Sequence, residues 1–373
     1  MDDAYFEDPE QAVEDRSLSS DELDDLLVSE NQPPEVTYST QDFPVDALVK
    51  RMQRGSMRIP QFGGSDKKLV IDGFQRGFVW SKAQMDRFIE SLLLGYPVPG
   101  IFLVKQADNV MLILDGQQRM ETLRRFYDGV HGERKFRLEN VGEDFRGLTY
   151  ETLGESLQLK LDDSFLHATI VSTDGSKVVN DAIYGIFERL NSGGTQLTPH
   201  EIRVALYAGP LMVTVEKLNN DADWRELYGA KNKRIRDHEL VMRIIALFIG
   251  ADSYSRPLKR FLNNFCNEHR EDNALPKETE NLFRSAATAL LEAGGRETFR
   301  RVGSSQINTA QAEAMMVGTM RNIAARTLSG NLKDDLESLR DNDVFARAVT
   351  RSTADNEAVR DRLRLATETL SQS

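Results

Sequence analysis

The sequence has little of what several classes of protein require. Cys266 is the only cysteine among the 373 residues, which excludes an intrachain disulfide and a cysteine-rich zinc site. The N-terminus shows no basic segment followed by an apolar run, so we expect no signal peptide. The longest apolar runs, Ile89–Leu94 and Ile244–Ile249, are too short to span a bilayer. These shortages predict a cytoplasmic protein without a membrane segment.

Two further absences narrow the chemistry. No Walker-type Gly-Lys-Ser/Thr loop occurs, which excludes the P-loop mode of phosphate binding. Histidine is scarce, and the last one, His269, lies well before the C-terminus. We expect structural roles for all five histidines, which are His131, His167, His200, His238 and His269.

The N-terminal segment, residues 1–35, is poor in basic residues. The net charge is -12, and residues 1–35 hold thirteen acids and one base, so the remainder is formally neutral. This acidic segment has the composition of a disordered, solvating tail. The acidity therefore excludes neither a phosphate-bearing ligand nor DNA. If the tail competes with nucleic acid for a basic face, its removal raises DNA affinity.

The hydrophobic pattern changes along the chain. Up to about residue 205, helical periods alternate with short apolar runs, and beyond it the pattern is almost wholly helical. This pattern predicts an α+β chain with a mixed N-terminal domain over residues 36–205 and an all-α domain over residues 206–373. The clearest predicted helices and strands are Val45–Gln53, Lys67–Ile71, Lys82–Leu94, Ile101–Lys105, Val110–Leu114, Gln117–Tyr127, Lys177–Leu190 and a helix from Pro199.

The strongest motif is an apolar strand that ends in Asp115-Gly116 and passes directly into a helix. A helix start presents unpaired backbone N–H groups and the positive end of the helix dipole, and glycine lets an anion approach closely. Arg119, in the first turn, can bind phosphate oxygens, with Gln117 and Gln118 as neutral donors and acceptors. Asp115 can hold a metal ion or orient water. The alternative is an ordinary tight turn with a surface salt bridge.

The same pattern, an apolar strand followed by Asp-Gly and then Gln-Arg, occurs a second time. Residues 67–76 again give an apolar strand, then Asp72-Gly73 and Gln75-Arg76. Two arginines that converge on one anion explain the repeat better than two unrelated turns, which adds Gln75 and Arg76 to the predicted site. For Trp80, just beyond, core packing is favoured over stacking on a base.

A third motif is a helix followed by an Asn-x-Gly-Gly loop over residues 187–194. Arg189 and Asn191 could face a ligand there. The alternative, a capped helix end followed by another capped helix with Thr198 as N-cap, is favoured for this motif taken alone.

At these places the sequence resembles one family, the N-terminal domain of GmrSD-type modification-dependent restriction endonucleases, which is similar in fold to ParB and sulfiredoxin. The matching pieces are Phe74–Trp80, Ile89–Pro99 with Ile101–Leu103, Asp115–Arg119, and Phe187–Gly194 with Glu201 and Arg203, and more loosely Arg236–Val241. The resemblance implies nucleotide binding through Asp115, Gly116, Gln117, Gln118 and Arg119, often with hydrolysis, in defence against foreign DNA.

The chain also departs from this family. Residues 63–73 look like extra sequence before the Phe-Gln-Arg motif, which makes the place of Arg76 less certain than that of Arg119. Full-length relatives carry a nuclease domain of the His-Asn-His kind, and its histidine pattern is missing here. We therefore expect a separately encoded nuclease rather than cleavage by this chain.

Three functions follow from these patterns. The first is a nucleotide-binding protein, with or without hydrolysis, in which Asp115, Gln118 and Arg119 would act on a nucleoside triphosphate with Mg²⁺ at Asp115. The second is a non-catalytic DNA-binding or adaptor protein that uses the basic clusters 231–236 and 256–260, which are equally well interpreted as solvated helix faces. The third is a nuclease in which Asp72 and Asp115 share a metal. The sequence leaves the oligomeric state open.

Overall fold

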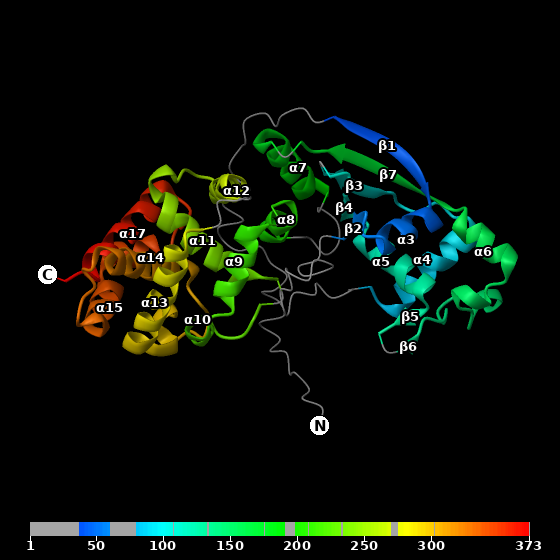
Figure 1. The fold of residues 1–373 in the computed structure, drawn as a ribbon. Helices are drawn as coiled ribbons and strands as arrows, with labels where there is room; N and C mark the ends of the chain where they lie inside the picture. The colour runs from blue at the N-terminus through cyan, green and yellow to red at the C-terminus, as the bar shows by residue number, and fades with distance from the viewer. Residues whose placement is uncertain are drawn as a thin grey trace, which may run out of the picture. The chain divides into compact units, whose positions relative to one another are not determined.

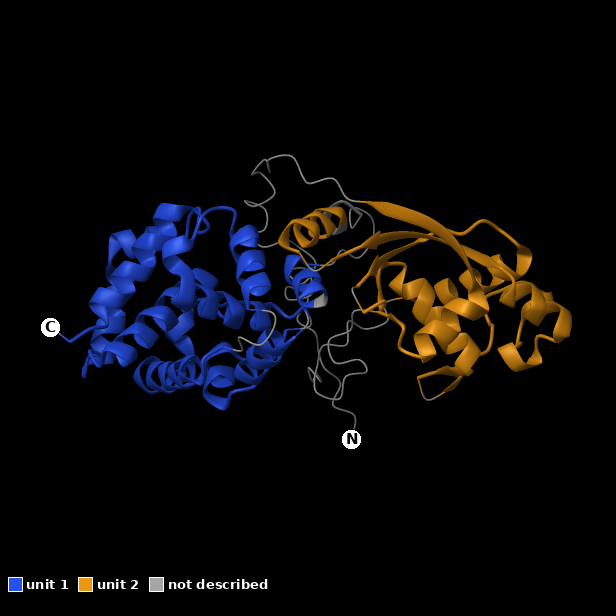
Figure 2. Ribbon diagram, turned by 45° about the horizontal axis from the view of Figure 1, so that its top comes forward, with its two compact units in different colours: residues 1–31, 197–373 blue, residues 32–196 orange. Residues whose placement is uncertain are grey.

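The computed structural model describes residues 37–59, 80–106, 108–132, 134–174, 176–190, 198–207, 209–232, 234–269, 275–301 and 303–372. The chain divides into two compact units between Gln196 and Leu197, shown in separate colours in Figure 2. We call them the sheet unit and the helical unit. The predicted tail 1–35 and the predicted strand Lys67–Ile71 lie outside the described residues. The α+β class is confirmed, whereas the likeness to ParB and sulfiredoxin stays a prediction.

A five-stranded mixed sheet forms the frame of the sheet unit (Figure 1). Its order is β1-β7-β3-β4-β2, in which β7 runs antiparallel to β1 and parallel to β3, and β4 runs antiparallel to β3 and parallel to β2. The N-terminal end of β3 and the C-terminal end of β4 therefore lie side by side, at the same end of the strands. The strands are β1 (Tyr38–Pro44), β2 (Met57–Arg58), β3 (Ile101–Lys105), β4 (Met111–Asp115) and β7 (Phe165–Ser172).

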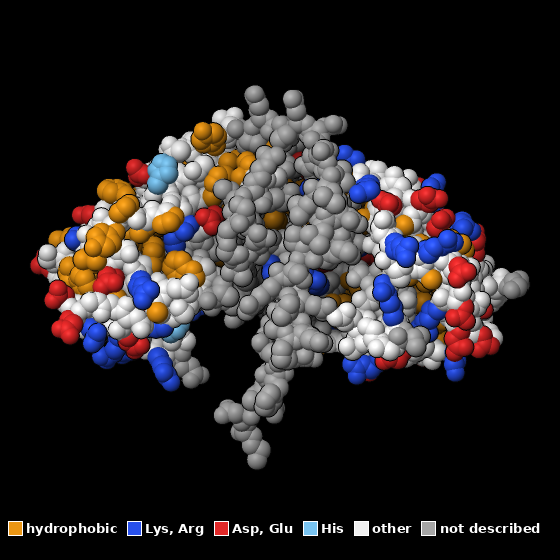
Figure 3. Space-filling view, turned by 180° about the vertical axis from the view of Figure 1, so that it is seen from behind, with side chains coloured by type: hydrophobic (Ala, Val, Ile, Leu, Met, Phe, Trp, Pro, Cys, Tyr) orange, Lys and Arg blue, Asp and Glu red, His pale blue; other side chains and the backbone are white. Residues whose placement is uncertain are grey.

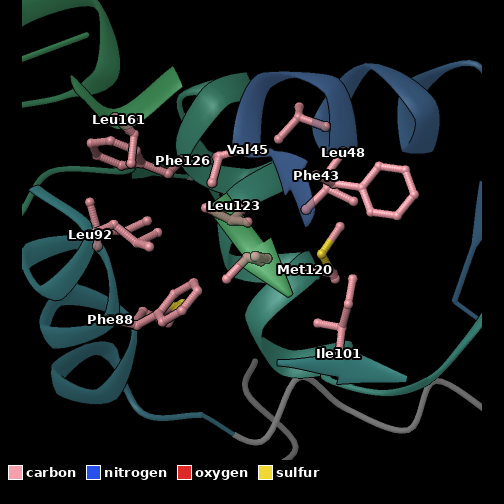
Figure 4. Packing of buried hydrophobic residues seen from close by; sticks show 14 of the residues in the cluster. Phe43, Val45, Leu48, Phe88, Leu92, Ile101, Met120, Leu123, Phe126 and Leu161 are labelled. Carbon is pink, nitrogen blue, oxygen red and sulfur yellow. The ribbon is translucent and has the colours of Figure 1, made fainter. Parts of the chain in front are cut away.

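Helices pack beside this sheet and on one another, with α3 and α4 each in contact with both α5 and α6. Their apolar stripes meet in a core to which α4 gives Phe88 and Leu92, and α5 gives Leu123 and Phe126 (Figure 4). Each fully buried side chain of this size contributes about 1.5–3 kcal/mol. The helices of the sheet unit are α3 (Val45–Gln53), α4 (Lys82–Leu94), α5 (Gln117–Asp128), α6 (Glu155–Asp162) and α7 (Lys177–Leu190), and a small hairpin joins β5 (Val130–His131) to β6 (Arg134–Lys135).

The helix ends follow local rules that the sequence shows. Ser81 caps α4 in a capping box: its hydroxyl accepts from the Gln84 amide, and the Gln84 side chain accepts from the Ser81 amide. Gly95 ends the same helix at φ 78°, in the left-handed region. Thr198 and Glu201 form the equivalent box at α8 (Pro199–Leu206). The predicted helix Lys82–Leu94 and the predicted N-cap Thr198 are confirmed.

The helical unit is built around α14 (Thr309–Ala325), which is buried on nearly all sides and contacts α11, α13 and α17. A Cβ added at Gly318 of α14 would lie 2.8 Å from the carbonyl carbon of Ala366 in α17, so these two helices approach closely. The other helices are α9 (Pro210–Asn219), α10 (Ala222–Tyr228), α11 (Arg236–Gly250), α12 (Leu258–Glu268), α13 (Lys277–Gly294), α15 (Leu332–Asp341), α16 (Asp343–Ala348) and α17 (Asn356–Thr369). None of the described helices is long and apolar enough to cross a bilayer.

Candidate functional site

The Asp115-Gly116 turn connects the end of β4 to α5, next to the first residues of β3. Asp115 is the last residue of β4 and pairs with Phe102 of β3. Gly116 has φ 91°, in the left-handed region, and the Met120 amide donates to its carbonyl at 2.9 Å to close the first turn of α5. A Cβ at Gly116 would lie 2.5 Å from Cγ2 of Ile101. The turn therefore requires glycine for its conformation and for its space.

Arg119 lies across this turn and holds it to the start of β3. Its Nη2 donates to the carbonyl of Gly100 at 2.8 Å and to Oδ2 of Asp115 at 2.8 Å. Its Nε is buried, and no group within the described chain accepts a hydrogen bond from it. A buried donor without an acceptor costs about 1–3 kcal/mol. Arg119 thus keeps hydrogen-bonding capacity that its protein contacts do not use.

The partner of Arg119 is placed differently. The Asp115 side chain is 59% exposed, whereas that of Arg119 is 14% exposed. The carboxylate therefore lies at the surface, and the guanidinium lies beneath it. This arrangement brings together two of the predicted site residues in one ion pair.

The two glutamines of the motif make different contacts. Gln117 turns its amide back to donate to the carbonyl of Ile113 in β4 at 3.2 Å. Gln118 accepts from the backbone N–H of Trp80 at 3.2 Å through its Oε1, which joins the start of α5 to the residue before the cap of α4. The Trp80 ring is half-buried and meets Phe88 edge-on, 5.6 Å between centroids. The core packing favoured for Trp80 is confirmed.

The remaining predicted site residues cannot be placed with this turn. Arg189 belongs to α7, but its side chain is not among those described. Asp72, Gln75, Arg76 and Asn191 lie outside the described residues. The convergence of Arg76 with Arg119 and the metal shared by Asp72 and Asp115 therefore stay predictions.

Within the described residues, the metal-binding capacity of the turn rests on Asp115. No group of three or more His, Cys, Asp or Glu side chains suited to a metal occurs in the described parts of the chain. From the described residues, a Mg²⁺ ion would have the Asp115 carboxylate, with phosphate oxygens and water as further ligands, a pattern that this ion accepts.

Glu201 and Arg203, the motif residues beyond the loop, belong to a buried polar network of the helical unit. The Glu201 carboxylate closes the capping box and accepts from Nε and Nη2 of Arg234 at 3.2 and 3.0 Å. Arg203 donates to Oδ1 of Asn263 at 2.9 Å and lies 3.7 Å from Glu239. These contacts join α8 to α11, α12 and the segment before α11, so they support the fold.

Two histidines extend this network. Arg203 can only donate, so Nδ1 of His200, 3.2 Å away, must accept, and the ring proton of His200 lies on Nε2. That nitrogen donates in turn to Nδ1 of His238 at 2.8 Å. Both rings are fully buried. Burial lowers the pKa of His200 well below its usual value and that of His238 to about 4, so both are neutral at pH 7.

The basic clusters of the helical unit are engaged within the fold. Lys231 pairs with Glu216, Arg234 with Glu201, and Lys259 is buried. Arg256 pairs with Asp355 at 2.5 Å. On the face shown in Figure 3, basic and acidic side chains are interspersed over the described surface. Both clusters therefore take part in contacts of the fold, mainly in the segments before α11 and α12, while DNA binding stays a prediction.

Sequence reasoning missed one part of the site, the carbonyl of Gly100. The segment Pro97–Gly100 carries no site motif of its own, yet the Gly100 carbonyl accepts from Arg119. A Cβ at Gly100 would lie 2.6 Å from the carbonyl oxygen of His167 in β7, so a side chain there is excluded. A glycine directly before a buried strand is the signal that could have indicated this close approach.

Comparison with protein families agrees with the motifs. Residues 59–208 match the family described as GmrSD restriction endonuclease, N-terminal domain. The predicted resemblance is thereby confirmed over this stretch, which contains the Asp115–Arg119 turn and α8. The match covers less than half of the chain, so it characterises this stretch rather than the whole protein. No curated protein and no solved structure matched the chain.

Proposed function

We propose that the sheet unit binds a nucleoside triphosphate at the Asp115–Arg119 turn, as the nucleotide-responsive part of a restriction or antiphage system. The observation that carries this proposal is the buried Nε of Arg119 at the start of a helix, for which no described residue supplies an acceptor. A phosphate group supplies the acceptor oxygens and the negative charge that both features favour.

The other residues of the turn take roles that agree with their contacts. Gly116 allows the left-handed turn that starts the helix, and its lack of a side chain leaves room for Ile101 and Arg119 beside the turn. Asp115, exposed at the surface, would hold Mg²⁺ on the phosphates or orient water. Gln118 would serve hydrolysis by positioning the water, and its bond to the Trp80 amide fixes its orientation. Gln75, Arg76, Arg189 and Asn191 would complete the nucleotide site.

The proposal divides the labour of the system between chains. This chain would sense or hydrolyse the nucleotide, and a separately encoded nuclease would cut DNA. The support for this division is that none of the five histidines of this sequence stands in a His-Asn-His arrangement.

Calorimetry of GTP, ATP and CTP binding with Mg²⁺ tests the proposal on wild type and Arg119→Ala. We expect one nucleotide to bind and Arg119→Ala to weaken it at least tenfold, because a hydrogen bond to a charged group contributes about 1.5–3 kcal/mol. Arg124→Ala is the matched control: Arg124 lies on the same helix and pairs with Glu121 and Asp128 instead. Equal binding by wild type and Arg119→Ala, or binding of none of the three nucleotides, would sink the proposal.

A phosphate-release assay then separates binding from hydrolysis. If the chain hydrolyses its nucleotide, Asp115→Ala and Gln118→Ala should lower turnover far more than affinity, since both residues would act on water or metal. Nucleotide binding without phosphate release would leave a sensor that does not catalyse.

A further inference from the structure

We infer that Asp115 is an internal competitor of the ligand: its carboxylate occupies Arg119 in the ligand-free chain, and a phosphate group replaces it. This inference rests on the proposed function and adds a means of regulation to the same site. It follows from the way in which one nitrogen of Arg119 is shared.

Arg119 uses only part of its binding edge. A guanidinium presents Nε and Nη2 as a parallel pair that fits two oxygens of one anion. Here Nη2 serves both Gly100 and Asp115, while Nε has no acceptor in the described chain. The single contact of Asp115 is thus a poor substitute for the two-pronged contact that a phosphate can make.

The two partners differ in their freedom to move. Arg119 is mostly buried and braced on Gly100, whereas most of the Asp115 side chain is in solvent. When an anion arrives, the exposed carboxylate is the group that rotates away, because its motion disturbs no packing. That rotation frees Nη2, beside Nε, for an oxygen of the anion.

Displacement also changes what Asp115 can bind. A carboxylate paired with an arginine is largely neutralised and is a weak ligand for Mg²⁺, whereas a released one is a full ligand. Phosphate binding would therefore prepare the metal site, and the metal would follow the phosphate. Asp115 would therefore weaken the binding of a phosphate chain without metal. It would strengthen the binding of the magnesium complex of that chain.

Calorimetry with inorganic triphosphate in EDTA tests the competition directly. We expect Asp115→Asn to bind triphosphate about two- to fivefold more tightly than wild type, the range that an exposed ion pair provides. Asp128→Asn is the matched control, since Asp128 pairs with Arg124 on the same helix at 2.8 Å, and its affinity should not change. With Mg²⁺ present, the gain of Asp115→Asn should disappear or reverse.

The outcomes separate this inference from the function on which it rests. If wild type binds triphosphate through Arg119 but Asp115→Asn binds equally or more weakly in EDTA, the competition is wrong and nucleotide binding stands. If neither nucleotide nor triphosphate binds wild type, both fall. Asp115→Ser, which also removes the charge, repeats the test if the asparagine variant does not fold, and a tighter complex there supports the inference equally.

Discussion

At Gly116 the chain passes from a strand into a helix within one residue. Its backbone lies in the left-handed region, which residues with a side chain rarely adopt. Replacement by alanine therefore has two costs. The left-handed conformation costs about 1 kcal/mol, and the contact with Ile101 adds about 1–3 kcal/mol of overpacking.

We predict that Gly116→Ala lowers the free energy of unfolding more than Gly95→Ala does, in urea titrations followed by circular dichroism. Gly95 has a similar φ of 78°, but a Cβ there meets nothing within 4 Å, so only the conformational cost applies. Equal losses for the two variants would show that Ile101 yields easily to a methyl group at the turn.

The same residue shows what a sequence can predict about a site. That a glycine follows Asp115 and precedes a helix is a local fact, and it leads directly to a left-handed turn with an arginine in its first helical turn. The partners of that arginine are not local. Gly100 lies 19 positions before Arg119, and Trp80 lies 38 before Gln118, so only the folded chain brings them together.

At the scale of elements, local signals were enough where a helix has its own caps. The limits of α4 are set by Ser81 and Gly95, and the predicted range Lys82–Leu94 agrees with them. Helix α6 was missed because Leu157, Leu159 and Leu161 alternate with polar residues, which is the pattern of a strand. Its tertiary contacts decide otherwise: Leu161 is fully buried, and Asp162 at its end accepts from the hydroxyls of Tyr127 and Tyr150.

The packing of α14 against α17 gives an element-scale prediction. Gly318→Ala should destabilise the protein by about 1–3 kcal/mol, since the new methyl group meets the backbone of Ala366, even though alanine favours a helix by about 1 kcal/mol. Thermal and urea unfolding measure the change.

Gly185→Ala in α7 is the control for that experiment. A Cβ at Gly185 meets nothing within 4 Å, so the gain in helix propensity should remain and the variant should be equal to wild type or more stable. If both substitutions were stabilising, the close approach of α14 and α17 would be contradicted.

At the scale of the whole molecule, the buried histidines connect stability to pH. In the folded chain burial lowers the pKa of both His200 and His238, whereas in the unfolded chain both titrate near 6.5. As pH falls below about 6.5, the two histidines bind protons in the unfolded state, whereas in the folded state they stay neutral. Stability is therefore full above pH 6.5 and is lost down to about pH 4, where His238 itself titrates.

We expect each of the two histidines to contribute about 1.4 kcal/mol per pH unit to this loss. The free energy of unfolding measured between pH 7 and pH 5 should fall less steeply in a His200→Gln, His238→Gln double variant, whatever its stability at pH 7. An unchanged slope in the double variant would assign the acid sensitivity to other groups.

The buried network also sets where the chain can be divided. The family match ends at residue 208, within the helical unit, just after α8, whose Glu201 and Arg203 find their partners on residues 234, 239 and 263. A fragment that stops at the end of the match would keep the charged side chains of α8 and lose the groups that neutralise them. The stretch recognised by sequence is therefore not a piece that folds as a unit, and fragments of this protein are better ended before α8 or extended through the helices that follow it.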